Sequence, residues 1–496
     1  MKKTAVTTVI LAVLMMVPVH SFAQYRDRKA AEDAPKTKTD LLLEEAQTAQ
    51  KPVVITLEQA LEIALSENVS VKVADLEIKR TEYAKKGAYA ALFPQIDLSA
   101  SYQRTIKKQV MYMDFDMSSI LPGMPGGEGE GEGGAGTDTG SSSSGNDGME
   151  VGRLNTLNGG VTAAMPIINA QLWKGIRISG LDVELAVEKA RASRLDMVTQ
   201  VKNAFFVTLF AKEAFNVYKE VYENAVENYN ETKKKFDSQK VSEFELIRAK
   251  TSVANAIPNV YNAESSVVLA LWQLKAVLGV DLDMNLDIAG ELEDWSQEMF
   301  YDIHQHDSIS LANNTTMKQL AIQTEQLAQN IKLQKYACIP SLALAFNFSM
   351  NTMANDVNFS EFRWTPYSYI GLSLNIPVFA GGKRHQAIRQ AKNQYQQVQL
   401  QVDNTERQLK IAIRQSLNTM ETNMKSYYAA QDAVAAAQKA YDIAEAAYKV
   451  GRSTLIELND AQLALTQSQL AQSQTVYNFI VAKTQLEQTL GQDFVN

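Results

Sequence analysis

Cysteine is nearly absent from this chain of 496 residues: Cys338 is the only one, so no disulfide can form within the chain. An excess of positive charge is lacking too. The net charge is −8 and no basic patch stands out along the sequence, which argues against a nucleic-acid partner. Beyond the N-terminus, no segment reaches the ~20 consecutive apolar residues that a membrane-spanning helix needs.

Signs of catalysis are missing as well. No nucleophile with its base, no phosphate-binding glycine loop and no pair of catalytic carboxylates can be recognised, so we expect neither an enzyme nor a cofactor. His304 and His306 have a spacing that could suit a metal ion. No third ligand accompanies them, so a pair of surface histidines is the favoured interpretation and no metal site is expected.

The N-terminus has the features of an export signal. Lys2 and Lys3 precede an apolar run over residues 5–19, and a small-x-small pattern ends at Ala23. These features predict a signal peptide over residues 1–23 and an exported mature chain. Because no cysteine stands at the cleavage point, we expect no lipid anchor there.

Four short segments alternate between apolar and polar residues, the pattern of a β-strand with two different faces. They lie at about 95–106, 155–166, 341–350 and 366–378. Each is close to the ~9–11 residues with which a tilted strand crosses a bilayer. An apolar face against lipid is the favoured interpretation, and a soluble sandwich is the alternative. Aromatic residues near the strand ends fit an interfacial belt: Tyr102, Tyr112, Trp364, Tyr367 and Tyr369.

The chain contains an internal repeat. Residues 236–250 match residues 448–462 at an offset of 212 (448 minus 236), and each half has the order helix, strand, strand, very long helix, turn, helix. After the signal peptide we predict five segments: an N-terminal extension at 24–55, a first repeat at 56–279 with its tip at 237–242, a linker at 280–308, a second repeat at 309–491 with its tip at 449–454, and a C-terminal tail at 492–496.

Four strands are too few to close a barrel. Open sheet edges are not tolerated in lipid, and small bacterial barrels have about eight strands, so several chains must share one barrel. Proline-free helical patterns run from about 169 to 235 and from about 383 to 450, each long enough for roughly 100 Å. A heptad pattern follows the second with one four-residue step. A hollow helical wall is favoured, and a solid coiled-coil rod is the alternative.

The segment 118–150 between the first two strands is of low complexity, rich in glycine and acidic residues. It cannot bury enough apolar surface to order itself. It lies away from the helices in the predicted order, so we expect an extracellular loop.

The helix–proline–strand junctions and the tip "YKVGRSTLIELNDA" (448–461) resemble the TolC-like outer membrane efflux protein family, over residues 56–491. The resemblance implies an α+β fold in which each chain gives four transmembrane strands to a shared 12-strand β-barrel, continuous with a long periplasmic α-helical barrel. It implies a homotrimeric exit duct in the outer membrane, opened at its periplasmic tip by an adaptor and an inner-membrane pump. Small-molecule efflux and protein secretion both fit. A periplasmic coiled-coil scaffold without membrane insertion is the alternative.

The resemblance also implies roles for residues at the second tip. Glu457 and Asp460, spaced i, i+3, match carboxylates that ring the constricted entrance of such channels. Six of them around a trimer axis would prefer cations, and their repulsion would raise their pKa values or attract a cation. A solvated acidic helix face is the alternative.

Two further sets are carried over from the family. Glu245 and Tyr448 resemble the pair that links neighbouring hairpins and holds the mouth shut. Two differences from the family occur at the turns, where Gln239 replaces the usual glycine and Ser453 replaces a basic residue. The tip residues that would contact the adaptor are Gln239, Lys240, Val241, Val450, Gly451, Arg452 and Ser453.

Overall fold

The computed structural model describes residues 52–111, 149–300, 310–356 and 362–492. The signal peptide, Tyr112, both linker histidines and most of the acidic loop lie outside these ranges. The described residues form two compact units: unit 1 draws on those within 1–81, 182–325 and 396–496, and unit 2 on those within 82–181 and 326–395. Among the described helices, none is both long and apolar enough to cross a membrane.

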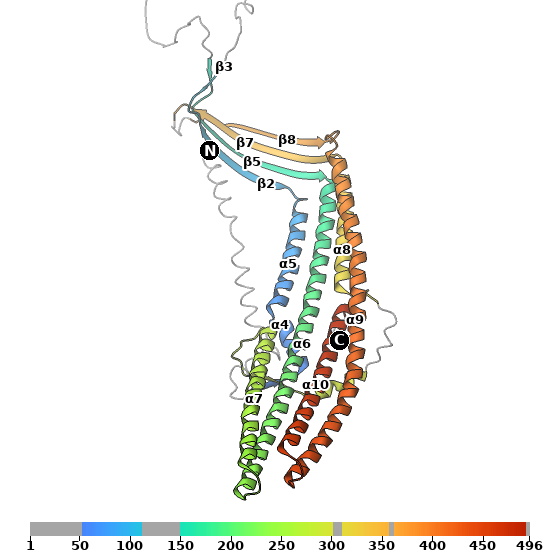
Figure 1. The fold of residues 1–496 in the computed structure, drawn as a ribbon. Coiled ribbons are helices and arrows are strands. Elements are labelled where there is room, and N and C mark those ends of the chain that lie inside the picture. Colours follow the sequence, from blue (N-terminus) through green and yellow to red (C-terminus); the bar gives the residue numbers. More distant parts are fainter. Residues whose placement is uncertain (1–51, 112–148, 301–309, 357–361, 493–496) are drawn as a thin grey trace, which may run out of the picture. The chain divides into compact units, whose positions relative to one another are not determined.

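Unit 2 is built on one antiparallel sheet in the order β2-β5-β7-β8 (Figure 1). The strands are β2 (Gln95–Arg104), β5 (Asn155–Ile168), β7 (Ser341–Ala354) and β8 (Thr365–Asn375). β7 continues four residues past the predicted end, paired with β5 as far as Ala354. Within the described residues, β2 and β8 each have one neighbouring strand in this sheet, so the sheet has two open edges.

The strand register separates an apolar from a polar face. One row across the sheet joins Ile96, Ala163, Phe346 and Ile370. Ile96 is 70% exposed and Ile370 is 71% exposed, so no other part of the chain covers the two ends of this apolar row. The neighbouring row, on the opposite face, contains polar residues in three of the four strands: Asp97, Thr162 and Asn347, followed by Tyr369.

The register distributes the residues of the expected aromatic belt over both faces of the sheet. Tyr102 aligns with Leu157 on the apolar side, and its hydroxyl donates to Asn155 Oδ1 at 2.8 Å. Tyr367 and Tyr369 instead share the face of Asn347, with their ring centroids 5.7 Å apart. The sequence analysis assigned these two by closeness to a strand end, whereas the odd position of each in β8 decides the face.

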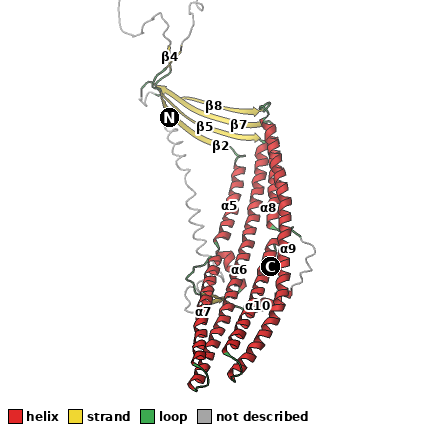
Figure 2. Ribbon diagram, in the orientation of Figure 1, coloured by secondary structure: helices red, strands yellow, loops and turns green. Residues whose placement is uncertain are grey.

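Helices make up most of the rest of the described chain (Figure 2). A further antiparallel pair of short strands, β3 (Gln109–Met111) and β4 (Met149–Val151), belongs to unit 2. The longest helices, α6 (Ala170–Asp237) and α9 (Lys383–Lys449), have 68 and 67 residues, or roughly 100 Å each at 1.5 Å per residue. The paired helices α7 (Glu243–Leu278) and α10 (Leu455–Leu490) have 36 residues each. The shorter helices are α4 (Leu57–Glu67), α5 (Val69–Ala90) and α8 (Thr315–Tyr336).

The core of unit 1 is formed where α4, α6, α7, α9 and α10 meet. Phe205, Met420 and Phe479 are each at most 1% exposed there. A short parallel pair of strands, β1 (Val53–Ile55) and β6 (Leu286–Ile288), joins this core, followed by the 3₁₀ helix η2 (Glu293–Phe300). The sequence analysis missed both strands, because three residues are too few to show alternation.

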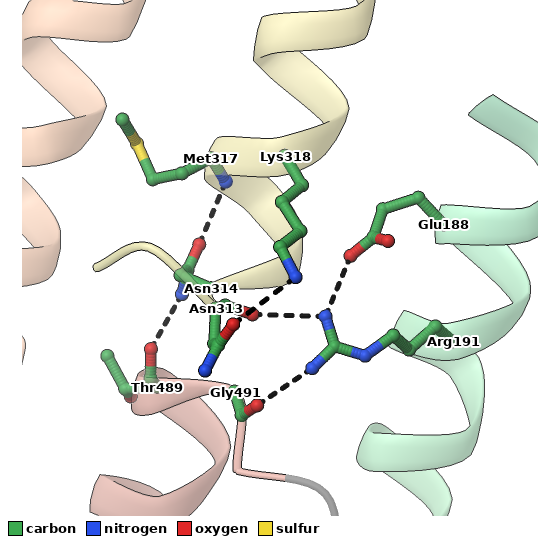
Figure 3. Close-up of polar contacts among 8 residues, drawn as sticks. All are labelled: Glu188, Arg191, Asn313, Asn314, Met317, Lys318, Thr489 and Gly491. Atoms are coloured by element: carbon green, nitrogen blue, oxygen red, sulfur yellow. Dashed lines mark hydrogen bonds and ion pairs between the residues drawn. The ribbon is translucent and has the colours of Figure 1, made fainter. Parts of the chain in front are cut away.

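A polar clasp in unit 1 ties α6 to the start of α8 and the end of α10 (Figure 3). Arg191 donates to Asn313 O at 3.1 Å and to Gly491 O at 2.8 Å, and it pairs with Glu188 at 3.1 Å. Asn314 Nδ2 donates to Thr489 O at 2.7 Å. A Cβ on Gly491 would lie 2.2 Å from Asn313 O, so the close crossing requires glycine.

Candidate functional site at the helical tips

The two tips in unit 1 have the same backbone turn, at positions 212 residues apart. After α6, Gln239 N donates to Phe236 O (2.7 Å) and Lys240 N to Lys235 O (2.8 Å). After α9, Gly451 N donates to Tyr448 O (3.1 Å) and Arg452 N to Ala447 O (2.8 Å). These pairs of bonds satisfy carbonyls that would otherwise be free at each helix end, as in a Schellman turn.

The turn needs a left-handed backbone, and only one tip has glycine for it. Gly451 has φ 78°, and Gln239 has φ 59° at the matching position. Gln239 is the only non-glycine residue with positive φ in the described part of the chain. The first tip therefore keeps the turn despite its departure from the family pattern, at a cost in backbone strain.

The helices that follow the turns begin with equivalent caps. Ser242 Oγ accepts from Glu245 N at 3.4 Å, and Thr454 Oγ1 accepts from Glu457 N at 3.3 Å. At the second tip the Glu457 carboxylate also accepts from Thr454 N at 2.9 Å, which completes a capping box. The Ser453 hydroxyl donates to the same carboxylate at 2.5 Å.

Glu457 therefore has a structural role within a single chain. The Ser453 hydrogen bond, followed by the bonds from Thr454, lowers the pKa of Glu457 below its ordinary value. This direction is opposite to the rise expected from repulsion in a ring of carboxylates. The two expectations concern different states, because the single chain contains no neighbouring copy of the tip. Asp460 is exposed one turn further along α10.

Tyr448 is 4% exposed at the end of α9 and contacts α6 through both of its polar ends. Its hydroxyl lies 2.5 Å from Thr232 Oγ1. Because the Thr232 hydroxyl already donates to Asn228 O at 2.7 Å, Tyr448 must be the donor in this bond. Lys235 Nζ donates to Tyr448 O at 2.9 Å and lies 4.5 Å from the centre of the Tyr448 ring.

Glu245 and Tyr448 line one groove of about 780 Å³ between the two turns. Burial raises the pKa of Tyr448, and the negative charge of Glu245 adds to this rise. In the single chain the Tyr448 hydroxyl is bonded to Thr232. The predicted latch residues, Glu245 and Tyr448, therefore interact through the charge of Glu245 and not through a direct hydrogen bond.

The predicted adaptor-contacting residues gather around this same groove. All seven line it, and Val450 is 71% exposed beside Gly451. The sequence analysis missed Lys235, which also lines the groove, and Thr232, which contacts the Tyr448 hydroxyl. Lys235 lies in a run of three lysines that resembles an ordinary solvated helix face, and only the fold shows that the third one binds Tyr448.

Comparison with known proteins identifies the family of this chain. The profile of the outer membrane efflux protein family matches residues 134–280 and 308–492, well over half of the chain. The chain belongs to the outer membrane efflux protein family. Among curated relatives, the outer membrane protein TolC of Vibrio cholerae is 20% identical over 343 residues, which cover 68% of this chain and 76% of the relative. The outer membrane efflux protein BepC of Brucella suis is 30% identical over 163 residues, or 33% of this chain and 35% of that one.

Solved structures share the efflux-protein fold. The Campylobacter jejuni CmeC outer membrane channel superposes with a TM-score of 0.64 at 19% identity, covering 92% of this chain and 93% of that one. The open state of the Neisseria gonorrhoeae MtrE outer membrane channel gives a TM-score of 0.64 at 17% identity, covering 88% of each chain. The TolC-like α+β fold expected from the sequence is thereby confirmed.

The tips of the chain offer exposed surface and charged side chains. No group of three or more histidine, cysteine, aspartate or glutamate residues is arranged to hold a metal ion anywhere in the ranges that the structure describes. The groove at the tips is lined by basic, acidic and small residues around a buried tyrosine. Such a surface can bind another protein and can present charge to passing ions.

Proposed function

We propose that the chain is one protomer of a homotrimeric exit duct in the outer membrane for efflux or secretion. The observation that carries the proposal is the sheet of unit 2, which has a bare apolar face and two open edges. Lipid excludes unpaired strand edges, so the sheet must be completed by strands from other copies. Three chains would then supply four strands each to one closed barrel.

The polar face of the sheet supports a water-filled interior. Asp97, Thr162 and Asn347 lie in one row, where a barrel of this kind would line its channel. The long helices α6 and α9 continue from the strand ends of β5 and β8 through short connections. They would extend the channel as a helical barrel in the periplasm.

The periplasmic entrance, in this proposal, is gated by the second tip. Glu457 and Asp460 would form a ring of six carboxylates, and Glu245 with Tyr448 would latch neighbouring hairpins. A periplasmic adaptor would grip the turn residues around the 780 Å³ groove, and an inner-membrane pump would supply the energy. Exposed Val450 and the open turn at Gly451 support this contact, since both offer surface without disturbing the core.

Membrane fractionation with chemical crosslinking tests the assembly. We expect the protein in the outer-membrane fraction, with crosslinked material at the size of three chains. A protein that leaves with the soluble periplasmic fraction would instead be the coiled-coil scaffold, the second interpretation of the sequence. A single chain that forms a closed pore would contradict the sharing of strands.

The gate is tested by single-channel recording in planar bilayers. Glu457→Gln with Asp460→Asn should raise conductance and lower cation preference, because the ring loses its charge. These substitutions are preferable to alanine, since glutamine at 457 can still accept the Thr454 amide in the cap. Glu223→Gln on α6 removes a charge away from the tip and serves as the control. Unchanged conductance and selectivity in the double variant would exclude the carboxylate gate.

A further inference from the structure

Positive charge gathers in the four segments that join the helices of unit 2 to its sheet. Residues 83–93, 168–181, 326–340 and 376–395 contain ten lysine or arginine residues and no aspartate or glutamate, although the net charge of the whole chain is −8. Each segment holds too few of them to stand out in the sequence, with two in each of the first three and four in the last. Only the fold brings them together.

The strand register places all four segments at one end of the sheet. Gln95 pairs with Ala164, near the end of β5, and Ser341 pairs with Asn375, the last residue of β8. Leu342 pairs with Ile168, so β5 ends where β7 begins. The chain therefore enters β2 and β7, and leaves β5 and β8, along the same border of the sheet (Figure 1).

The cations lie a short way beyond this border. Lys335 is six residues before β7, Lys174 is six residues after β5, and Lys383 is eight residues after β8. Lys174 follows a stretch that is helical from Ala170, so at about 1.5 Å per residue it is on the order of 10 Å from the end of β5. The headgroup region of a bilayer extends roughly 5–8 Å beyond the hydrocarbon core, and Lys and Arg side chains reach toward it.

Exposed aromatic side chains lie between the strands and the cations. Phe93 is 66% exposed before β2, Trp173 is 58% exposed after β5, and Phe379 is 86% exposed after β8. Aromatic rings favour the boundary between hydrocarbon and water. The order along the chain is thus apolar strand face, aromatic ring, cation, which is the order of environments met on leaving a bilayer.

Several of the cations are free to meet a ligand from outside. Arg177, Lys335 and Lys383 are exposed. Others are partly held within the unit: Lys174 Nζ lies 5.7 Å from the centre of the Tyr336 ring, and Arg384 donates to Pro377 O at 2.9 Å. The exposed members are accessible to a counter-charge from another molecule, and no carboxylate side chain lies within the four segments themselves.

We propose that these four segments form a basic belt that binds the anionic headgroups of the lipid leaflet next to the helices. This inference rests on the membrane insertion proposed above. A leaflet surface presents negative charge in a plane around the protein, and a belt of cations bordering a lipid-facing sheet matches that geometry. The belt would fix the depth at which the sheet sits in the membrane.

Fluorescence quenching by brominated lipids tests the belt in the full-length protein. Trp272→Phe and Trp364→Phe leave Trp173 as the reporter at the border, with Trp295 packed against Phe206 in unit 1 as the internal reference. The protein is reconstituted in phosphatidylcholine vesicles containing brominated phosphatidylglycerol or brominated phosphatidylcholine. We expect about fivefold preference for phosphatidylglycerol next to Trp173, declining toward equality at high ionic strength.

A variant that lacks four of the belt cations is the second part of this test. Lys86→Gln, Arg177→Gln, Lys335→Gln and Lys383→Gln remove one exposed cation from each segment and should abolish most of the preference. The matched control replaces four exposed lysines of unit 1 that do not line the tip groove: Lys219, Lys233, Lys234 and Lys250. It should keep the preference.

The outcomes separate the belt from the duct. A wild-type protein that inserts and conducts but shows no lipid preference, or a preference that the belt variant keeps, overturns the belt and leaves the duct intact. Cations facing the channel interior would give that result. Failure of the wild type to insert into any vesicle overturns the duct and the belt together. If the belt variant fails to fold, the salt dependence of the wild type still decides the question.

Discussion

Replacing Gly451 with alanine probes the backbone on which the second tip depends. Gly451 has φ 78°, and no other group lies within 4 Å of where its Cβ would be, so the substitution changes backbone energetics and little else. A left-handed conformation costs a residue with a Cβ roughly 1–2 kcal/mol. The reduced freedom of the unfolded chain returns about 0.4–1 kcal/mol of this. The net loss in local stability should be about 1 kcal/mol.

Hydrogen exchange of peptides covering 449–454 measures this loss. Because the Gly451 and Arg452 amides are bonded in the turn, a loss of about 1 kcal/mol should make them exchange about fivefold faster. Gln239→Gly is the reciprocal change at the first tip, where φ is 59°. It should slow exchange at 237–242 by about two- to threefold, since relief of strain exceeds the added freedom of glycine.

Gly87→Ala in α5 supplies the control for the substitution itself. Gly87 lies inside a helix with open space around its Cβ position and no positive φ, so alanine should stabilise that helix by roughly 1 kcal/mol. The same chemical change therefore has opposite signs at two positions. Slower exchange in Gly451→Ala, or faster exchange in Gln239→Gly, would refute the assignment of strain to the left-handed turn.

Three further predictions follow from the described contacts. Tyr448→Phe should loosen the tip by about 0.5–1.5 kcal/mol, read as faster exchange at residues 446–452, because Thr232 loses its donor. The lowered pKa of Glu457 means that its cap is fully effective above the ordinary value of 4.5 and is lost as pH falls through the folded-state value, so exchange at the start of α10 should rise in acid and Glu457→Gln should remove that dependence. Burial, with the charges of Glu291 and Glu293, raises the pKa of Glu213. The contribution of Glu213 to folding stability is therefore complete below pH 4.5, its ordinary pKa, and declines as pH rises through its folded-state pKa. Glu213→Gln should make the emission of Trp295, which packs on Phe206, less sensitive to pH.

The strands and long helices were predictable because their patterns repeat over many residues. Alternation from Ile96 onward marks β2, and the absence of proline marks α6 and α9. β1 and β6 were not predictable, since each has three residues and gains its stability from pairing with a partner more than 200 residues away. Closeness to a strand end also did not show which face of the sheet Tyr367 and Tyr369 occupy, because the exact position within the strand decides orientation.

At the tips, local signals were readable and distant ones were not. Thr454 and Glu457 form the T-x-x-E pattern of a capping box, so the hydrogen-bonding role of Glu457 was available from sequence beside its proposed role in the gate. The bond between Tyr448 and Thr232 joins residues 216 positions apart, and no local sequence pattern predicts it. The basic residues near the sheet were missed for the same reason, since four distant segments supply them.

The distribution of contacts in unit 1 indicates which end of the α9–α10 hairpin can move. At the far end of α10, Gly491 and Thr489 are held by Arg191 and Asn314, beside a core that includes fully buried Phe479. At the tip, the hairpin is attached to α6 by the hydroxyl and carbonyl of Tyr448 and by a smaller cluster of alanines, leucines and tyrosines. Regions with fewer buried apolar contacts open at lower free energy. Separating the tip of the α9–α10 hairpin from α6 and α7 would therefore require loss of the Tyr448 contacts, of the hydrogen bonds that Asn459 makes with Ser252 (3.0 Å) and Gln462 with Asn224 (3.3 Å), and of part of that cluster. The clasp at Arg191 would keep the far end of α10 in place.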